Sequence, residues 1–185
     1  SVTPLFHIYG IVGPILSAAA TSSSVICLPA FRPQEFFHIL QAVKITWYAA
    51  SPAIHYAVAE YAEKINVDKD DYDLRLIRSG SAPLPLQLIE KLKSCFGAVV
   101  VQGYGLTETA GLATCNSPLL GKIKNESVGK PTGCEIAIMD EQGNFLPPSV
   151  AGEIVIRGES VTKGYENIDS EERIFLKNGW FRSGD

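Results

Sequence analysis

The sequence predicts an α/β fold, in which a mostly parallel sheet is flanked by helices and is followed by the start of a small β-rich subdomain. Three observations support this prediction. Short apolar runs alternate with segments of helical spacing over the first two thirds of the chain. Such alternation is typical of parallel strands joined by crossover helices. After about Ser117 the helical segments stop, and short strands separated by turn-forming residues replace them.

The helices of the first part are predicted by apolar spacing and by their end residues. In the segment 34–43, apolar side chains recur at helical spacing, and Pro33 suits a first-turn position. The segment 53–65 has a similar apolar face. The segment 85–96 ends before Gly97, a residue type that commonly follows a helix. We therefore expect three helices over these segments.

Four apolar runs between the helical segments are strand-like. The run 25–28 is closed by Pro29, and the run 45–50 is β-branched and aromatic. The other two, 74–77 and 98–101, lead into loops that contain glycine. Loops at the carboxyl ends of parallel strands are where ligands usually bind, so these loops are the first candidates for a site.

The second part of the chain is predicted to be β-rich. Two short alternating strands are expected over 135–139 and 153–157, with a turn-rich stretch between them. The change from alternating strands and helices to short strands places the boundary between the two subdomains near residues 119–125. The predicted division is an α/β subdomain over 1–120 and an incomplete β-rich subdomain over 121–185.

The composition is typical of a globular chain and argues against some classes of partner. Of 185 residues, 46% are hydrophobic and 19% are charged, and the net charge is −4 without a lysine or arginine block. Nucleic acid and anionic membranes are therefore poor candidates for the main partner. The most apolar stretch, 8–20, is shorter than the ~20 residues that a membrane span needs. We expect no transmembrane segment and a cytoplasmic location, or a peroxisomal one if the source is eukaryotic.

The cysteines are too widely separated for a zinc site and have no histidine at ligand spacing. They indicate free thiols in a reducing compartment. The four are Cys27, Cys95, Cys115 and Cys134.

A glycine-containing loop over 102–109 directly follows a predicted buried strand. Its two glycines allow a sharp turn and close approach to a ligand. Thr107 offers a hydroxyl group for a phosphate oxygen, and Glu108 offers the hard oxygen ligand that Mg²⁺ prefers. Tyr104 offers an aromatic face to a base. The loop lacks the ending of a Walker loop, and taken alone it is at least as compatible with an ordinary glycine turn.

Three further segments each have a functional and a structural interpretation. The small residues of 79–84 would leave a slot for a flat ring, but alone they are better explained as a tight turn before a helix. His7 lies among aromatic residues and is either a core histidine or a group beside a carboxylate substrate. Asp185 follows a glycine turn, where a carboxylate either accepts hydrogen bonds from a ribose diol or is simply solvated.

These segments, in this order, resemble the superfamily of acyl-CoA synthetases, luciferases and nonribosomal-peptide adenylation domains. The motif Y-G-L-T-E-T at 104–109 is among the most specific signatures of that superfamily. Supporting motifs extend over nearly the whole chain. They are F-H-x-x-G at 6–10, S-G-S-A-P-L at 79–84, V-G-K-P at 128–131, G-E-I-V-I-R-G at 152–158, K-G-Y at 163–165 and W-F-R-S-G-D at 180–185.

The resemblance implies a role for each matching residue. Tyr104 would pack on adenine, and Asp185 would bind the ribose hydroxyl groups. Thr107 would bond the α-phosphate, Glu108 would hold Mg²⁺, and His7 would lie between the acyl pocket and the phosphate; these three form the implied catalytic set. The implied nucleotide-binding set is Gly80, Ser81, Ala82, Gln102, Gly103, Tyr104, Gly105 and Asp185. In the neighbouring motifs, Tyr9 would line the acyl pocket, whereas Glu153 and Lys163 are better explained by structural roles.

The implied activity is that of an ATP-dependent carboxylate–CoA ligase. Such an enzyme forms an acyl-adenylate and then an acyl-CoA thioester, releasing pyrophosphate and AMP. The implied cofactors and partners are ATP or AMP, Mg²⁺, coenzyme A and a small or medium carboxylic acid. Two alternatives stay open, namely an adenylation domain that loads a carrier protein and a non-catalytic nucleotide-binding module. The oligomeric state also stays open.

Two parts of the family pattern have no counterpart in this sequence. The phosphate loop rich in Ser, Thr and Gly would precede Ser1, and the hinge and the C-terminal lobe with its lysine would follow Asp185. Both ends of the chain also look cut from a longer one. We therefore expect an internal fragment that shows little or no ATP–pyrophosphate exchange by itself but retains weak adenine-nucleotide binding.

Overall fold

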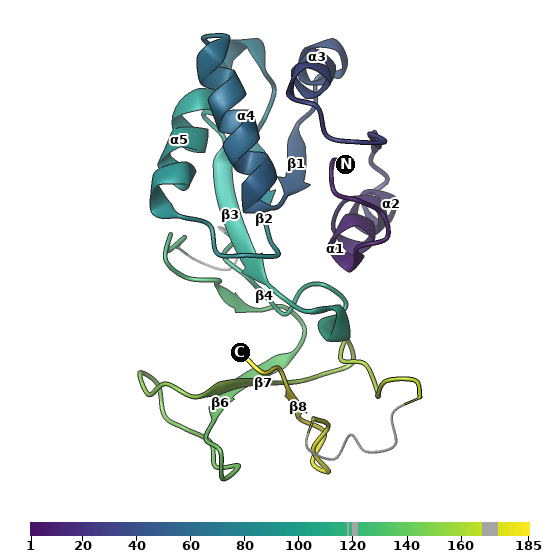
Figure 1. Cartoon of the computed structure of the whole chain (residues 1–185), viewed down its shortest axis with the longest axis vertical. Coiled ribbons are helices and arrows are strands. Elements are labelled where there is room, and N and C mark those ends of the chain that lie inside the picture. The colour runs from purple at the N-terminus through teal and green to yellow at the C-terminus, as the bar shows by residue number, and fades with distance from the viewer. Residues whose placement is uncertain (118, 120–121, 168–173) are drawn as a thin grey trace.

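The structure is a computed structural model that describes residues 1–117, 119, 122–167 and 174–185. Figure 1 shows an α/β layer with a smaller sheet beneath it, and the C-terminus lies between the two. The described residues form one five-stranded sheet and one three-stranded sheet. The predicted fold class is confirmed.

The larger sheet has the strand order β1-β2-β3-β4-β5. Its parallel strands are β1 (Trp47–Ala50), β2 (Leu76–Ser79) and β3 (Val99–Tyr104). The short antiparallel strands β4 (Thr114–Cys115) and β5 (Lys130–Pro131) extend it. The register pairs Ala50 with Ser79 and Ser79 with Gln102. The carboxyl ends of the parallel strands therefore meet at one edge, from which the loops beginning at Gly80 and Gly105 emerge.

Three helices pack with the parallel strands, and all three predicted helices are confirmed within one residue at each end. They are α3 (Pro33–Val43), α4 (Pro52–Lys64) and α5 (Leu86–Phe96). Proline opens α3 and α4, and Gly97, with a φ of 63°, follows α5 in the left-handed region. The core between helices and sheet includes Ile77, Leu88 and Leu92, which have at most 1% exposure.

The apolar stretch 8–20 is a broken helical segment. It consists of α1 (Ile8–Gly10), the π-helix η1 (Ile11–Leu16) and α2 (Ser17–Ala20). Pro14 has no backbone N–H to donate, which explains the wider turn at this point. The hydroxyl group of Ser17 donates to the Val12 carbonyl oxygen at 3.2 Å. Over the described ranges, no helix combines the length and the apolarity needed to cross a bilayer.

All four strand predictions of the first part differ from the structure: the prediction 45–50 begins two residues before β1, and the prediction 98–101 ends three residues before the end of β3. The run 25–28 is not a strand of either sheet; among the described residues its backbone bonds Ser1, whose carbonyl oxygen accepts from the Leu28 amide at 3.0 Å. The prediction at 74–77 is displaced by two residues, because the ladder of β2 starts at Leu76. Before that point, the Arg75 and Leu76 amides both bond the Thr46 carbonyl oxygen, at 2.9 and 3.3 Å.

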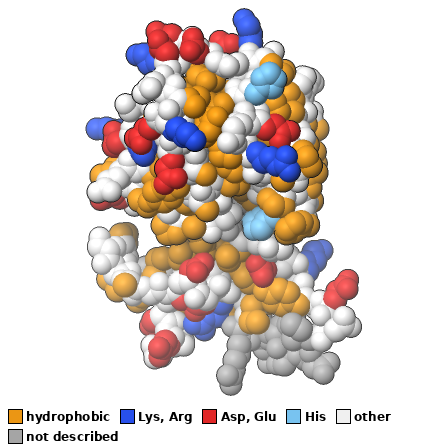
Figure 2. Space-filling model, turned by 45° about the horizontal axis from the view of Figure 1, so that its top comes forward, with side chains coloured by type: hydrophobic (Ala, Val, Ile, Leu, Met, Phe, Trp, Pro, Cys, Tyr) orange, Lys and Arg blue, Asp and Glu red, His pale blue; other side chains and the backbone are white. Residues whose placement is uncertain are grey.

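The smaller sheet is antiparallel, with the order β6-β7-β8. Its strands are β6 (Glu135–Met139), β7 (Glu153–Arg157) and β8 (Phe181–Arg182), and the first two have the predicted bounds. Ile156 and Phe181 pack with Ala113 from the loop before β4, so this sheet shares a core with the larger one. Figure 2 shows hydrophobic side chains at the surface where the two parts meet, and interspersed acidic and basic side chains elsewhere on that face.

The predicted division at residue 120 stays a prediction. Residues 120 and 121, on either side of it, lie outside the described residues. β5 lies beyond the proposed boundary, yet it pairs with β4 of the larger sheet. All four cysteines are free thiols.

Candidate functional site

Two adjoining cavities lie at the carboxyl ends of β2 and β3. One has a volume of about 220 Å³ and the other about 520 Å³. They share Ser81, Gly103, Gly105 and Leu106 in their walls. A third cavity of about 320 Å³ lies beside the edge strand β1 and contains none of the predicted site residues. The first two occupy the position where ligands bind in sheets of this type, so we take them as the candidate site.

The structure brings the predicted site residues together, although they come from four separate segments. The smaller cavity is lined by His7, Tyr9, Gly80, Ser81, Gly103, Gly105 and Thr107, among others. The larger cavity is lined by Ser81, Ala82, Gln102, Gly103, Tyr104, Gly105 and Asp185, among others. Only Glu108 of the predicted set lines neither cavity. It follows Thr107 directly in the short helix η3 (Thr107–Thr109), at the rim of the smaller cavity.

The glycines of the site are required by the packing of the chain itself. A Cβ at Gly105 would lie 2.6 Å from the Leu112 backbone, and one at Gly103 would lie 2.7 Å from the Thr114 carbonyl oxygen. A Cβ at Gly80 would lie 2.9 Å from the Tyr9 ring. Folding alone explains these three glycines, and close approach to a ligand stays a prediction.

Tyr104 and Asp185 connect the two sheets across the larger cavity. The Tyr104 hydroxyl donates to the Asp185 carboxylate at 2.6 Å. Burial of the ring, together with this hydrogen bond, raises the pKa of Tyr104 to about 12. Asp185 is also held by its backbone, because its carbonyl oxygen accepts from the Ile154 amide of β7 at 3.0 Å. The carboxylate is exposed, and its other oxygen can accept from a ligand.

Glu108 is held by the connection between β7 and β8 of the smaller sheet. The Tyr165 hydroxyl donates to Glu108 Oε1 at 2.6 Å, and the Thr162 amide donates to the Glu108 carbonyl oxygen at 2.7 Å. Within the described ranges, no three His, Cys, Asp or Glu side chains are grouped as ligands for a metal ion. A single carboxylate still fits Mg²⁺, which keeps several waters and is commonly held by one or two carboxylates together with substrate phosphates.

His7 is exposed, so its interpretation as a core histidine is wrong. Its Nδ1 accepts from the Tyr9 amide at 3.2 Å and caps the start of α1, which explains its orientation. Tyr9 is buried against Gly80, and this burial raises the pKa of Tyr9 to about 12. The two side chains thus form one side of the smaller cavity.

An ion pair behind the site holds the C-terminal loop. Arg182 Nε donates to Glu153 Oε2 at 2.6 Å, and the Gly184 amide donates to Glu153 Oε1 at 3.0 Å. Both side chains are about three-quarters buried, with 25% and 21% exposure. Glu153 therefore has a structural role next to Asp185. Lys163 lines neither cavity.

We expect the chain to lose stability in acid through Glu153. Its hydrogen bond with Arg182, assisted by the Gly184 amide, lowers the pKa of Glu153. A folded-state pKa below the unfolded value gives stabilisation that is present above the unfolded value and is lost as pH falls through the folded one. Glu153→Gln should therefore lower stability at pH 7 by about 1 kcal/mol and reduce its decline below about pH 4. Urea denaturation at pH 7 and pH 3.5 measures both effects.

The pair Glu135–Arg157 is the matched control, because it has the same chemistry but side chains with 61% and 40% exposure. Glu135→Gln should change the pH dependence less than Glu153→Gln. Equal effects of the two variants would contradict a special role for the pair at Glu153.

Sequence reasoning missed several residues around the cavities. Tyr165 was visible within the K-G-Y motif, but nothing in that motif indicates its bond to Glu108, 57 residues away. Asn125 and Glu126 line the larger cavity and had no local signal, whereas Val128, which also lines it, was visible only as the first residue of the V-G-K-P motif. They enter the site because β4 and β5 return the chain to the end of β3.

The chain is similar to known proteins over its whole length. The model of the AMP-binding enzyme family matches residues 1–166. The oxalate–CoA ligase of Arabidopsis thaliana is 37% identical over the whole chain, which covers 36% of that protein. The long-chain-fatty-acid–CoA ligase of Bacillus subtilis is 33% identical, again over the whole chain and 33% of that protein. The chain therefore spans about a third of the length of these relatives.

Solved structures of the same kind share the fold. The o-succinylbenzoate–coenzyme A synthetase of Bacillus subtilis, solved in complex with ATP and magnesium ion, superposes with a TM-score of 0.83 at 31% identity. The match covers 100% of this chain and 38% of that one. From its motifs, its fold and the match over 1–166, we conclude that the chain belongs to the AMP-binding enzyme family, whose members among these relatives are CoA ligases.

Proposed function

We propose that this chain forms the AMP-facing part of an ATP-dependent carboxylate–CoA ligase. The observation that carries the proposal is the convergence of four motif segments on two adjoining cavities at the carboxyl ends of β2 and β3. The identity of the relatives as CoA ligases supports coenzyme A as the acyl acceptor. A small or medium carboxylic acid is the proposed substrate. A cytoplasmic or peroxisomal location remains a prediction.

The larger cavity is the proposed nucleotide site. Tyr104 would present its ring to adenine beside Ala82, and the free oxygen of Asp185 would accept from the ribose hydroxyl groups. Thr107, in the wall of the adjoining cavity, would donate its hydroxyl group to the α-phosphate. These positions are consistent with a nucleotide that extends from the larger cavity into the smaller one, where His7 would lie beside the acyl group.

The proposed reaction has two steps that balance in atoms and charge. A carboxylate oxygen of the substrate attacks the α-phosphorus of ATP, an oxygen–phosphorus bond forms, and pyrophosphate leaves. A thiolate then attacks the acyl carbon, a thioester forms, and AMP leaves. Mg²⁺ would neutralise developing phosphate charge. The contribution of this chain is to orient the nucleotide, because positioning supplies much of the rate enhancement in such reactions.

We expect the chain to bind AMP and to lose most of this affinity in Asp185→Ala. A carboxylate that accepts hydrogen bonds from ribose contributes about 1.5–3 kcal/mol, so the dissociation constant should rise by roughly tenfold or more. Calorimetric titration with AMP measures the effect. Asp71→Ala is the matched control, since Asp71 is an exposed carboxylate in the connection before β2, at the opposite edge of the sheet. An equal loss in both variants, or no binding by the unmodified chain, would contradict the proposed site.

A further inference from the structure

The residues 124–128, which we call the wall segment, lie between β4 and β5 and close one side of the larger cavity. Asn125, Glu126 and Val128 line this cavity together with Ala82 and Tyr104. The wall segment belongs to no strand or helix. Its position must therefore be set by contacts with its neighbours, and side-chain amides supply most of them.

Gln102, the last buried residue of β3 before the glycine loop, bonds the wall segment directly. Its Nε2 donates to the Asn125 carbonyl oxygen at 2.6 Å, and its Oε1 accepts from the Leu84 amide at 3.4 Å. The side chain is buried, with 8% exposure. Both ends of the carboxamide are thus engaged by backbone groups of residues that line the cavity.

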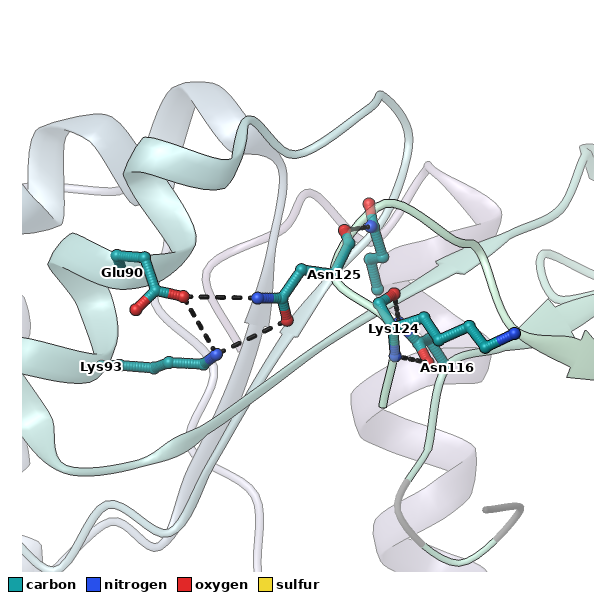
Figure 3. Close-up of polar contacts among 6 residues, drawn as sticks. Glu90, Lys93, Asn116, Lys124 and Asn125 are labelled. Atoms are coloured by element: carbon teal, nitrogen blue, oxygen red, sulfur yellow. Dashed lines mark hydrogen bonds and ion pairs between the residues drawn. The ribbon is translucent and has the colours of Figure 1, made fainter. Parts of the chain in front are cut away.

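Two further contacts hold the same segment (Figure 3). The buried Asn116 carboxamide pairs with both backbone groups of Lys124: it donates to the carbonyl oxygen and accepts from the amide at 3.2 Å. On the other side, the Asn125 carboxamide donates to Glu90 Oε1 at 3.3 Å and accepts from Lys93 Nζ at 3.5 Å. The wall segment is therefore tied to β3, to the loop after β4 and to α5.

From these contacts we infer that Gln102 is a positioning residue of the nucleotide pocket, which fixes the wall segment and does not itself read the base. The inference rests on the proposed function, and it gives Gln102 a different role in the pocket from the nucleotide contact that the family resemblance implied. If the carboxamide turned toward a ligand, the buried Leu84 amide would lose its partner, at a cost of about 1–3 kcal/mol. The 2.6 Å bond to Asn125 would be lost as well.

A positioning residue and a residue that reads the base affect ligand binding differently. A residue that sets the width of the pocket affects every flat purine in the same way. A residue that reads the base directly affects only those bases that carry the group it bonds. Gln102 should therefore contribute equally to the binding of purine nucleotides with and without an amino group at position 6.

The first experiment is amide hydrogen exchange on the chain without nucleotide. In Gln102→Met, which keeps the length of the side chain but removes the amide, exchange should be at least tenfold faster at Lys124 and Ser127. Their amides bond Asn116 Oδ1 and the Lys124 carbonyl oxygen in the folded chain. Protection in α5 should be unchanged. Gln41→Met is the matched control, because Gln41 is an exposed residue of α3. Unchanged exchange at the wall segment in Gln102→Met would overturn the inference.

The second experiment compares AMP with purine riboside 5′-monophosphate, which has hydrogen in place of the 6-amino group. Gln102→Met should weaken both ligands by the same factor, about tenfold for the loss of one hydrogen bond to a fixed wall. A loss for AMP with no loss for purine riboside monophosphate would show direct reading of the base and overturn the inference. If the unmodified chain binds neither ligand, the proposed function fails, while the exchange experiment still decides whether Gln102 holds the wall segment.

A second variant protects the test against a folding defect of Gln102→Met. Asn125→Ala leaves the backbone carbonyl that Gln102 bonds and removes only the contacts to Glu90 and Lys93. It should accelerate exchange at Lys124 and Ser127 by a smaller factor and weaken both nucleotides equally. An AMP-selective loss in Asn125→Ala, or no effect on exchange, would count against a wall held by these amides.

Discussion

Replacing Gly129 by alanine is expected to destabilise the chain by about 3–5 kcal/mol, which combines a left-handed backbone penalty with a steric overlap. Gly129 has a φ of 92°, and an added Cβ would overlap the carbonyl group of Cys115 and the Asn116 nitrogen. These are backbone atoms of the strand β4 and its continuation, so no change of rotamer relieves the overlap. The melting temperature should fall by roughly 10 °C.

Gly143→Ala separates the two contributions. Gly143 has a φ of 87°, close to that of Gly129, but an added Cβ there meets no atom within 4 Å. This variant should lose only the conformational part, about 1–2 kcal/mol. Thermal and urea denaturation of the two variants measure the difference. Equal losses would show that the pairing of β4 with β5 adapts to a methyl group, contrary to the prediction.

The second large effect is a loss of stability between neutral and mildly acidic pH that depends on His55. This side chain has 0% exposure, and its Nδ1 lies 3.0 Å from the Tyr48 hydroxyl oxygen. Within the part of the chain that the structure describes, Nε2 has no hydrogen-bond partner. Burial lowers the pKa of His55 to about 4, and the nearby carbonyl groups of Arg78 and Ala50 oppose this shift without reversing it.

Because burial lowers the pKa of His55, the folded chain loses stability as pH falls. The unfolded chain takes up a proton on His55 near pH 6.5, whereas the folded chain resists protonation until about pH 4. Stability due to His55 is therefore complete above about pH 6.5 and declines as pH falls toward 4, by at most about 3 kcal/mol. Urea denaturation at pH 7.5 and pH 5 measures this slope.

The double variant His55→Leu with Tyr48→Phe removes both polar partners, so neither is left buried and alone. Its stability should change little between pH 7.5 and pH 5. His38→Asn is the control, since His38 is exposed on the neighbouring helix α3, and this variant should keep the slope of the unmodified chain. A double variant that retains the slope would place the acid sensitivity elsewhere.

Much of the fold was predictable because its signals are local. The strands β6 and β7 have the predicted bounds, because each is a five-residue window rich in apolar and β-branched residues with turn-forming residues on either side. The helices begin at proline or end before glycine, which mark their limits. The strand prediction for 25–28 was wrong because an apolar run becomes a strand only when it pairs with the edge of a sheet, and over the described ranges the backbone of this run bonds Ser1 instead.

The site was predictable in its location but not in its internal connections. Loops after β2 and β3 had to lie together once those strands were parallel neighbours, which brought Ser81 beside Gly103. The bonds of Gln102 to Asn125 and of Tyr165 to Glu108 join residues 23 and 57 positions apart. No local sequence pattern predicts these hydrogen bonds, because they depend on how the chain returns to the site after β3.

The hydrogen bonds of Tyr104 with Asp185 and of Tyr165 with Glu108 both join the end of the larger sheet to the smaller one. Any ligand that contacts both groups of residues acts as a cross-link between two bodies that otherwise share a modest apolar core. Reciprocity of coupled equilibria then requires that ligand affinity and the mutual affinity of the two sheets rise and fall together. Substitutions in the shared core around Ala113 and Phe181 would thus alter ligand binding without touching the cavity.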